Sequence, residues 1–163
     1  MLTVKIGVVE DEMIIAASIV STLKKLNYEV STPASSYFEA LEMIEKEQPH
    51  LLLLDINLGK QKDGNDVAEF VRANHQLPII FLTANSDIAT VQRAKTLKPN
   101  AYLLKPFTKD DLFASIEIAI SNFYENADRN SKKENLIVKS GYDFVNIKFE
   151  KILFIQSNDN YVS

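Results

Sequence analysis

The hydrophobic positions along the chain alternate between two periods. Five short apolar runs are typical of buried strands, and they lie at residues 4–9, 28–34, 51–54, 79–83 and 101–105. Between these runs, apolar residues recur every three or four positions, which is typical of amphipathic helices. Because strands and helices that alternate in this way connect by right-handed crossovers, the pattern predicts an α/β domain over residues 1–126. Its core would be a five-stranded parallel sheet, doubly wound, with helices on both faces.

The pattern changes after residue 126. Residues 128–134 contain no apolar residue, so residues 127–134 are expected to form a linker or the frayed end of the last helix. Three short apolar runs follow without a helical period between them. They indicate an incomplete all-β segment over residues 135–163. We expect residues 136–139 and 143–148 to form a hairpin, with residues 151–156 as a third strand, and the sheet edge favours pairing with a second copy.

Composition restricts the functional classes. The chain has 163 residues, a length that suffices for one full domain and part of another. Of these residues 46% are hydrophobic and 25% are charged, which is ordinary for a globular protein. A net charge of −4 gives no general indication of nucleic-acid or membrane binding. The absence of cysteine excludes disulfides and thiol chemistry. Since neither a signal peptide nor a membrane-spanning run is present, we expect a soluble, cytoplasmic protein.

Polar residues stand where four of the predicted strands end. Glu10 and Asp11 follow the first strand, Asp55 ends the third, Thr83 the fourth and Lys105 the fifth. The carboxyl ends of parallel strands meet at one edge of a sheet, where open α/β folds bind their ligands. Three carboxylates at that edge would repel one another unless a cation intervened, and Mg²⁺ is the hard cation that prefers such oxygen ligands.

This combination predicts phosphoryl transfer. An aspartate beside a metal ion can attack phosphorus and form an acyl phosphate. The hydroxyl of Thr83 and the ammonium group of Lys105 can donate hydrogen bonds to phosphoryl oxygens. We therefore interpret Asp55, Thr83 and Lys105 as the reactive set, with Mg²⁺ as the cofactor.

Residues 8–11, Asp55, residues 83–84 and residues 105–107 resemble the signature of the receiver domain of bacterial two-component response regulators. That domain has the CheY-like, flavodoxin-type fold, and the resemblance covers residues 1–126. It implies that Asp55 accepts a phosphoryl group from a sensor histidine kinase. It also implies a phospho-acceptor signalling protein rather than an enzyme, apart from catalysis of its own phosphorylation and dephosphorylation.

The resemblance also assigns individual roles. Mg²⁺ would be held by Asp11, Asp55 and the main-chain carbonyl of Asn57, with Glu10 in support. Thr83 and Lys105 would bind the phosphoryl group, and Thr83 and Tyr102 would act as switch residues. The sharp turn after the fifth strand, together with the family, predicts a cis peptide bond between Lys105 and Pro106.

The chain departs from the family pattern at two places. Glu10 stands where Asp is commoner, and the loop after Asp55 lacks the usual proline and is one residue longer.

The family also implies a homodimer. Dimerisation would use the fourth helix, fifth strand and fifth helix. Charged residues there are expected to supply salt-sensitive ion pairs, namely Arg93, Lys95, Lys109, Asp110 and Asp111.

Residues 136–138 and 152–162 resemble the beginning of a LytTR-type DNA-binding domain, an all-β module that contacts DNA with its loops. The resemblance covers about a third of that module and implies a transcriptional output. The expected DNA-contacting loops would lie beyond Ser163, so DNA would be bound only through the complete C-terminal domain.

Two alternatives remain at this point. One is a pseudo-receiver that acts as a protein-interaction module, although the full set of acidic residues with Thr83 and Lys105 argues against it. The other is a haloacid-dehalogenase-like phosphatase, which also uses an aspartate nucleophile and Mg²⁺. In that family a second aspartate acts as acid and base two residues after the nucleophile, whereas Asn57 occupies that place here and cannot transfer a proton.

Overall fold

The computed structural model describes residues 3–59, 61–84, 88–133, 135–140 and 143–148, with side chains described as far as Glu125 except at residues 88–91. Within that part of the chain, no helix is long and apolar enough to cross a membrane.

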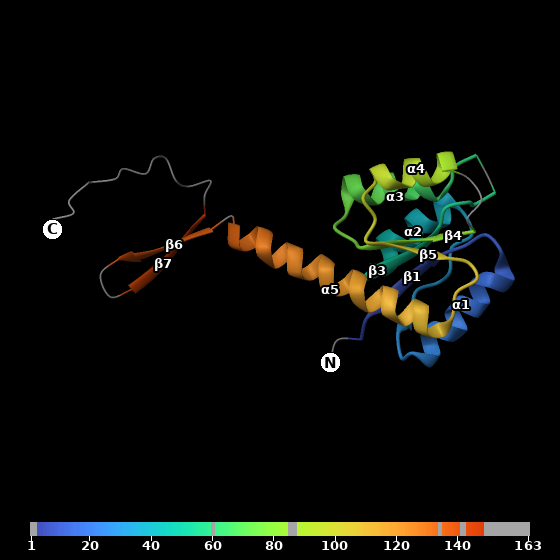
Figure 1. Ribbon diagram of the computed structural model, residues 1–163, viewed down its shortest axis with the longest axis horizontal. Coiled ribbons are helices and arrows are strands. Elements are labelled where there is room, and N and C mark those ends of the chain that lie inside the picture. Colours follow the sequence, from blue (N-terminus) through green and yellow to red (C-terminus); the bar gives the residue numbers. More distant parts are fainter. Residues whose placement is uncertain (1–2, 60, 85–87, 134, 141–142, 149–163) are drawn as a thin grey trace. The chain divides into compact units, whose positions relative to one another are not determined.

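The predicted parallel sheet is confirmed. Its five strands have the order β2-β1-β3-β4-β5, and every neighbouring pair is parallel (Figure 1). The strands are β1 (Lys5–Val9), β2 (Glu29–Val30), β3 (Leu51–Asp55), β4 (Ile79–Thr83) and β5 (Ala101–Leu104). The helices that follow them are α1 (Met13–Lys25), α2 (Tyr37–Glu47), α3 (Gly64–Asn74), α4 (Ile88–Thr96) and α5 (Lys109–Lys133).

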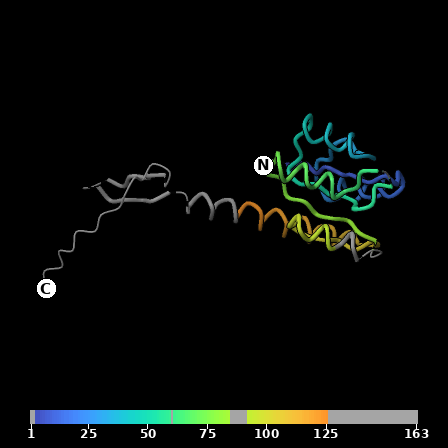
Figure 2. The backbone as a smooth tube through the Cα atoms, turned by 90° about the horizontal axis from the view of Figure 1, so that it is seen from above, coloured from blue at the N-terminus to red at the C-terminus, as the bar shows by residue number. Residues whose placement is uncertain are grey.

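Strand β3 lies at the centre of the sheet and is buried on both faces. Leu52 and Leu54 pack in the core beneath α2 and α3, whereas Leu51 and Leu53 pack in the core beneath α1 and α5. Figure 1 shows these two helical layers on opposite sides of the sheet. Figure 2, seen from above, shows α2 near one end of the strand order and α5 near the other. The uninterrupted run of leucines therefore reflects burial on both sides.

Two elements differ in length from the prediction. Strand β2 is confined to Glu29–Val30, and the chain pairs with β1 again only at Ala34. Between them stands Pro33, which has no N–H to donate to a strand partner. Helix α5 was expected to end near Asn126, with residues 127–134 as a linker or as the frayed end of this helix, and it continues to Lys133, which agrees with the second alternative. The stretch expected to be a linker contains neither glycine nor proline, so nothing in it interrupts the helix.

The chain divides into two compact units, and the second begins at Tyr124. In the second unit, β6 (Asn135–Ser140) pairs antiparallel with β7 (Asp143–Lys148). These are the two strands of the expected hairpin. The expected third strand, residues 151–156, lies outside the described residues. The incomplete all-β segment and its LytTR resemblance therefore stay predictions.

Candidate functional site

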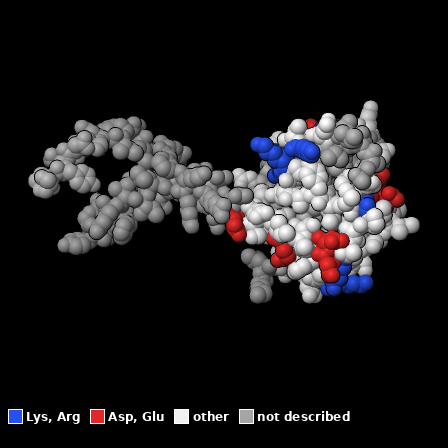
Figure 3. All heavy atoms as spheres, viewed as in Figure 1, with Lys and Arg blue, Asp and Glu red and all other residues white. Residues whose placement is uncertain are grey.

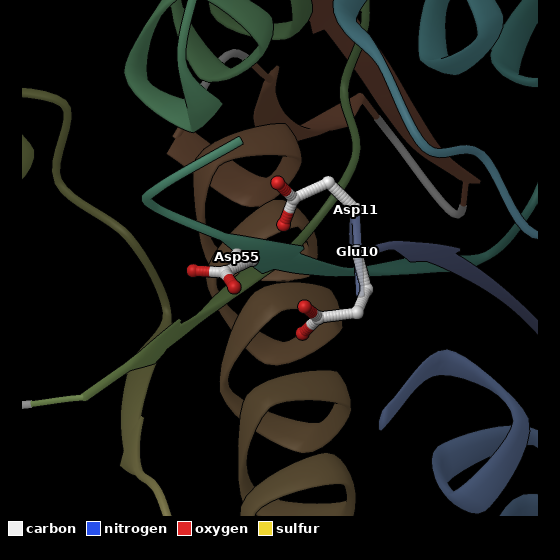
Figure 4. A group of neighbouring side chains, drawn as sticks. All are labelled: Glu10, Asp11 and Asp55. Carbon is white, nitrogen blue, oxygen red and sulfur yellow. The ribbon is translucent and has the colours of Figure 1, made fainter. Parts of the chain in front are cut away.

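Three carboxylates meet at the carboxyl edge of the sheet. Strand β3 ends with Asp55, and the neighbouring β1 is followed at once by Glu10 and Asp11. One carboxylate oxygen from each of the three residues lies within 4.8 Å of the other two. Figure 4 shows Glu10 and Asp11 extending from the end of β1 toward Asp55. The structure thus brings together the acidic residues that the sequence placed at this edge.

Lys105 is inserted among these carboxylates. Its Nζ lies 2.6 Å from Asp55 Oδ2 and 2.6 Å from Glu10 Oε2. The side chain of Glu10 is fully buried. Burial raises the pKa of Glu10, although its hydrogen bond with Lys105 opposes the change. Burial alone would lower the pKa of Lys105, but its hydrogen bonds with Asp55 and Glu10 outweigh burial and raise that pKa. Lys105 is therefore a firmly protonated cation at the centre of the site.

The turn after β5 directs Lys105 toward the carboxylates. The main-chain N–H of Lys105 donates to the carbonyl of Thr83 at 2.8 Å, which continues the pairing of β5 with β4. The Lys105–Pro106 peptide bond is cis, and this confirms the prediction.

The loop from β3 to α3 is packed closely against Asp55. Asp55 Oδ1 accepts a hydrogen bond of 2.9 Å from the main-chain N–H of Asn57. At the far end of the loop, Gly64 donates its N–H to the carbonyl of Ile56 at 2.9 Å. A Cβ atom on Gly64 would lie 2.0 Å from the Asp55 carbonyl oxygen. Sequence reasoning noted the unusual length of this loop but did not single out Gly64. The signal was a glycine directly after the acidic residue that caps α3.

Thr83 and Tyr102 lie on the two strands beyond β3. Thr83 ends β4 and is buried, with 8% of its surface exposed. Tyr102 pairs across the strands with Phe81, and the two rings stack with their centroids 5.9 Å apart. Burial raises the pKa of the Tyr102 phenol. The residue is still 38% exposed, so Tyr102 occupies a partly open position at the edge of the sheet.

A cavity of about 650 Å³ opens beside the site, between α1 and the loop that joins β5 to α5. Asp55, Asn57 and Lys105 line it on the polar side, and Ile14 and Phe107 contribute to the apolar side. Ile14 is 88% exposed although it belongs to a helix that packs on the core. Sequence reasoning did not single out Ile14. Its signal is an apolar residue off the buried face of α1, three positions after Asp11.

Two of the charged residues expected on the dimerisation face, Arg93 and Asp111, have partners within the chain. Arg93 forms ion pairs with Asp63, Asp66 and Glu69 of α3. Asp111 Oδ2 accepts hydrogen bonds from the main-chain N–H and the hydroxyl of Thr108. These partners within the chain were not anticipated, and ion pairs across a dimer stay a prediction.

Residues 6–117 match the family model described as the response regulator receiver domain. The match covers most of the chain, and the chain therefore belongs to this family. Receiver domains are signalling modules of two-component systems, and their active sites bind Mg²⁺. The fold is the CheY-like α/β fold that the resemblance implied.

Individual relatives agree with this assignment. The transcriptional regulatory protein PdtaR of Mycobacterium tuberculosis is 35% identical over 121 residues, which are 74% of this chain and 58% of PdtaR. The chain therefore spans less than two thirds of the length of that relative. The signal receiver domain of a modulated diguanylate cyclase from Desulfovibrio desulfuricans G20 is 35% identical with a TM-score of 0.72. That alignment covers 76% of this chain and 98% of the other.

A third comparison concerns the metal. The receiver domain of the sensor histidine kinase PA1611 from Pseudomonas aeruginosa PAO1 is 28% identical, with a TM-score of 0.66 over 73% of this chain and 98% of the other. Its structure is described with a magnesium ion coordinated in the active site cleft.

Family membership leaves the phosphatase alternative without support.

Proposed function

We propose that this chain is a phosphorylation-controlled switch that accepts a phosphoryl group on Asp55 with Mg²⁺ bound beside it. One observation carries the proposal. The carboxylates of Glu10, Asp11 and Asp55 converge within 4.8 Å, and the ammonium group of Lys105 pairs directly with Asp55. This arrangement combines a nucleophile, oxygen ligands for a hard cation and a second positive charge for the phosphoryl group.

The residues present fit Mg²⁺. Asp11 and Asp55 offer carboxylate oxygens, and the carbonyl of Asn57 lies on the loop that follows directly. We assign these three groups as protein ligands, and we assign Glu10 as a supporting residue because its longer side chain can act on the ion through a water molecule. When bound, Mg²⁺ would offset the negative charge of the carboxylates and of an incoming phosphoryl group.

The chain's own residues then carry out the transfer. A carboxylate oxygen of Asp55 forms a new P–O bond while the bond from phosphorus to the donor, a phosphohistidine of a sensor kinase, breaks. Lys105 exchanges its contact with Asp55 for a phosphoryl oxygen, and the Thr83 hydroxyl donates to another. Thr83 and Tyr102 would shift with the phosphoryl group and act as the switch, which alters the surface of α4, β5 and α5.

Partners are assigned from the surfaces next to the site. The exposed Ile14 and the cavity between α1 and Phe107 give the kinase an apolar contact beside Asp55. On β5 and α5, Tyr102, Leu104 and Phe113 are exposed apolar residues that suit a homodimer.

We assign the output to transcription because the relative PdtaR is a transcriptional regulatory protein and because the C-terminal segment resembles a LytTR domain. On the face that Figure 3 shows, Lys and Arg form small separate groups and no continuous basic patch. Specific DNA binding is therefore assigned to a complete C-terminal domain and not to the receiver unit.

Mg²⁺ should stabilise the folded protein. At about one hundred times its dissociation constant, a ligand that binds only the folded state contributes roughly 2.7 kcal/mol. For a chain of this size we expect the Tm to rise by about 5–10 °C. Asp11→Asn should abolish most of this rise in thermal unfolding, whereas Asp110→Asn, at an exposed position on α5, should keep it. An equal rise in both variants would contradict the assigned ligand.

The proposal is tested by the intact mass of the protein after incubation with Mg²⁺ and a small acyl-phosphate donor. We expect a gain of one phosphoryl group that requires Mg²⁺ and is lost in acid, as an acyl phosphate would be. A protein whose mass does not change under these conditions would support the pseudo-receiver instead.

A further inference from the structure

Three acidic side chains at the start of α3 surround one cation of α4. The guanidinium of Arg93 lies 3.3 Å from Asp63 Oδ2, 3.0 Å from Asp66 Oδ1 and 2.9 Å from Glu69 Oε1. The three acidic residues are spaced three positions apart, so they share one side of the helix. Helices α3 and α4 lie next to each other in Figure 1. We call these four residues the Arg93 cluster.

Two members of the Arg93 cluster also build the first turn of α3. Asp63 is the N-cap, and its Oδ1 accepts hydrogen bonds from the main-chain N–H groups of Asn65 and Asp66. In return, Asp66 Oδ2 accepts a hydrogen bond of 2.7 Å from the N–H of Asp63. Arg93 therefore binds the same carboxylates that hold the helix start in place.

The start of α3 is in turn joined to the phosphoryl-acceptor site. The residue after the cap, Gly64, donates its N–H to the carbonyl of Ile56, which stands between Asp55 and Asn57. Its Cα approaches the Asp55 carbonyl so closely that no side chain fits between them. A short path of hydrogen bonds and tight packing thus leads from Arg93 to the loop that carries Asp55 and Asn57.

Helices α3 and α4 are joined at two places, one at Arg93 and one at Arg72, and the two contacts differ in their physical character. At the end of α4, the half-buried Arg72 donates to the carbonyls of Leu97 and Lys98 at 3.1 Å and 3.0 Å. The acceptors of those hydrogen bonds are uncharged main-chain carbonyls. In the Arg93 cluster, by contrast, the side chain of Arg93 is 43% exposed and its partners are charged. Salt therefore weakens the Arg93 cluster more than the contact at Arg72.

Electrostatics keeps the Arg93 cluster closed in the structure. Hydrogen bonds with Glu69 and Asp66 raise the pKa of Arg93, so it stays protonated. Partial burial would raise the pKa of Asp66, but the N–H of Asp63 and the guanidinium of Arg93 outweigh it and lower that pKa. Without the guanidinium, the three carboxylates would repel one another at the point where α3 begins.

We propose that Arg93 is a positioning residue that couples α4 to the phosphoryl-acceptor loop through Asp63 and Asp66. The inference rests on the proposed function of Asp55 and adds the route by which that site and α4 influence each other. Coupling of this kind is reciprocal. Closing the Arg93 cluster favours the loop geometry that binds Mg²⁺, and binding of Mg²⁺ favours the position of α4 seen here.

The test compares Arg93→Gln with Lys95→Gln, which removes an exposed cation from the same helix. Two quantities are measured, namely amide hydrogen exchange at residues 64–66 and the dissociation constant for Mg²⁺. For Arg93→Gln we expect exchange to rise about three- to tenfold and Mg²⁺ to bind about threefold more weakly, a size typical of exposed ion-pair networks and weak coupling. Arg93→Lys should recover part of both effects.

Salt gives a second comparison. Raising the NaCl concentration to about 0.5 M should increase exchange at residues 64–66 in the natural protein, and it should have little further effect in Arg93→Gln. Glu69→Gln removes one carboxylate of the Arg93 cluster without touching the cap. It should show a smaller rise in exchange and a smaller loss of Mg²⁺ affinity than Arg93→Gln, and it replaces Arg93→Gln in the test if that variant does not fold.

Two results would overturn the coupling. One is that Arg93→Gln and Lys95→Gln behave alike in both measurements. The other is that Arg93→Gln loosens α4 alone, with exchange at residues 64–66 and the affinity for Mg²⁺ unchanged, which would give Arg93 a local role only. Failure of the natural protein to bind Mg²⁺ would instead contradict the proposed function, and the exchange measurement would still decide whether Arg93 positions the loop.

Discussion

Asp55→Asn should abolish labelling by a small acyl-phosphate donor. The substitution keeps the size of the side chain and an oxygen that can accept the N–H of Asn57. It removes the negative charge that attacks phosphorus and that pairs with Lys105 at 2.6 Å. Loss of a nucleophile lowers rates by on the order of 10³-fold or more. The measurement is the intact mass after a fixed incubation with Mg²⁺ and the donor.

A matched control keeps this result specific. Asp110→Asn makes the same chemical change at an exposed position on α5 and should label like the natural protein. Circular dichroism of both variants should show the same helix content, since neither change affects the core. Full labelling of Asp55→Asn would show that another residue is the acceptor.

Gly64→Ala should both destabilise the protein and impair its site. The new Cβ would lie 2.0 Å from the Asp55 carbonyl oxygen, a main-chain atom that cannot rotate away. The loop, the start of α3 or the end of β3 must therefore move. Such overpacking costs about 1–3 kcal/mol and sometimes more, which corresponds to a fall in Tm of about 2–12 °C for a chain of this size. Thermal unfolding measures this fall, and the rate of acyl-phosphate labelling should decrease as well.

Gly7→Ala provides the comparison for Gly64→Ala. Its Cβ would meet Leu52 Cδ1 at 2.9 Å and Met43 Cε at 3.0 Å. Both are ends of flexible side chains, so they can shift at lower cost than a main-chain carbonyl. We expect a smaller fall in Tm and an unchanged labelling rate. If Gly64→Ala were as stable and as active as the natural protein, the close packing of the loop on Asp55 would be wrong.

The sheet and the composition of the site were predictable from sequence because both follow from topology. The leucines at 51–54 indicated a strand buried on both faces, and β3 is the central strand. Once the strands are parallel, residues that end them must share one edge. For this reason Glu10, Asp55 and Lys105 lie within hydrogen-bonding distance although 95 residues separate the first from the last.

Properties that depend on the packing of one surface against another were not predictable. The ion pairs that Arg93 makes within the chain were not predicted, because whether a surface arginine meets solvent or three carboxylates depends on how α4 lies beside α3. The requirement for glycine at position 64 arises from an approach of two chain segments that no local pattern reveals. The sequence also left the end of α5 undecided, because a polar stretch without helix breakers is compatible with both a linker and a helix.

The central claim, that Asp55 carries the phosphoryl group, is tested most directly by locating the modification. Borohydride reduces an acyl phosphate to an alcohol, so a phosphorylated aspartate becomes homoserine. The protein is labelled with the donor and Mg²⁺, reduced and digested, and its peptides are sequenced by mass spectrometry. The account predicts homoserine at position 55. Unchanged Asp55 in fully labelled protein, with the phosphoryl group or homoserine at another position, would contradict it.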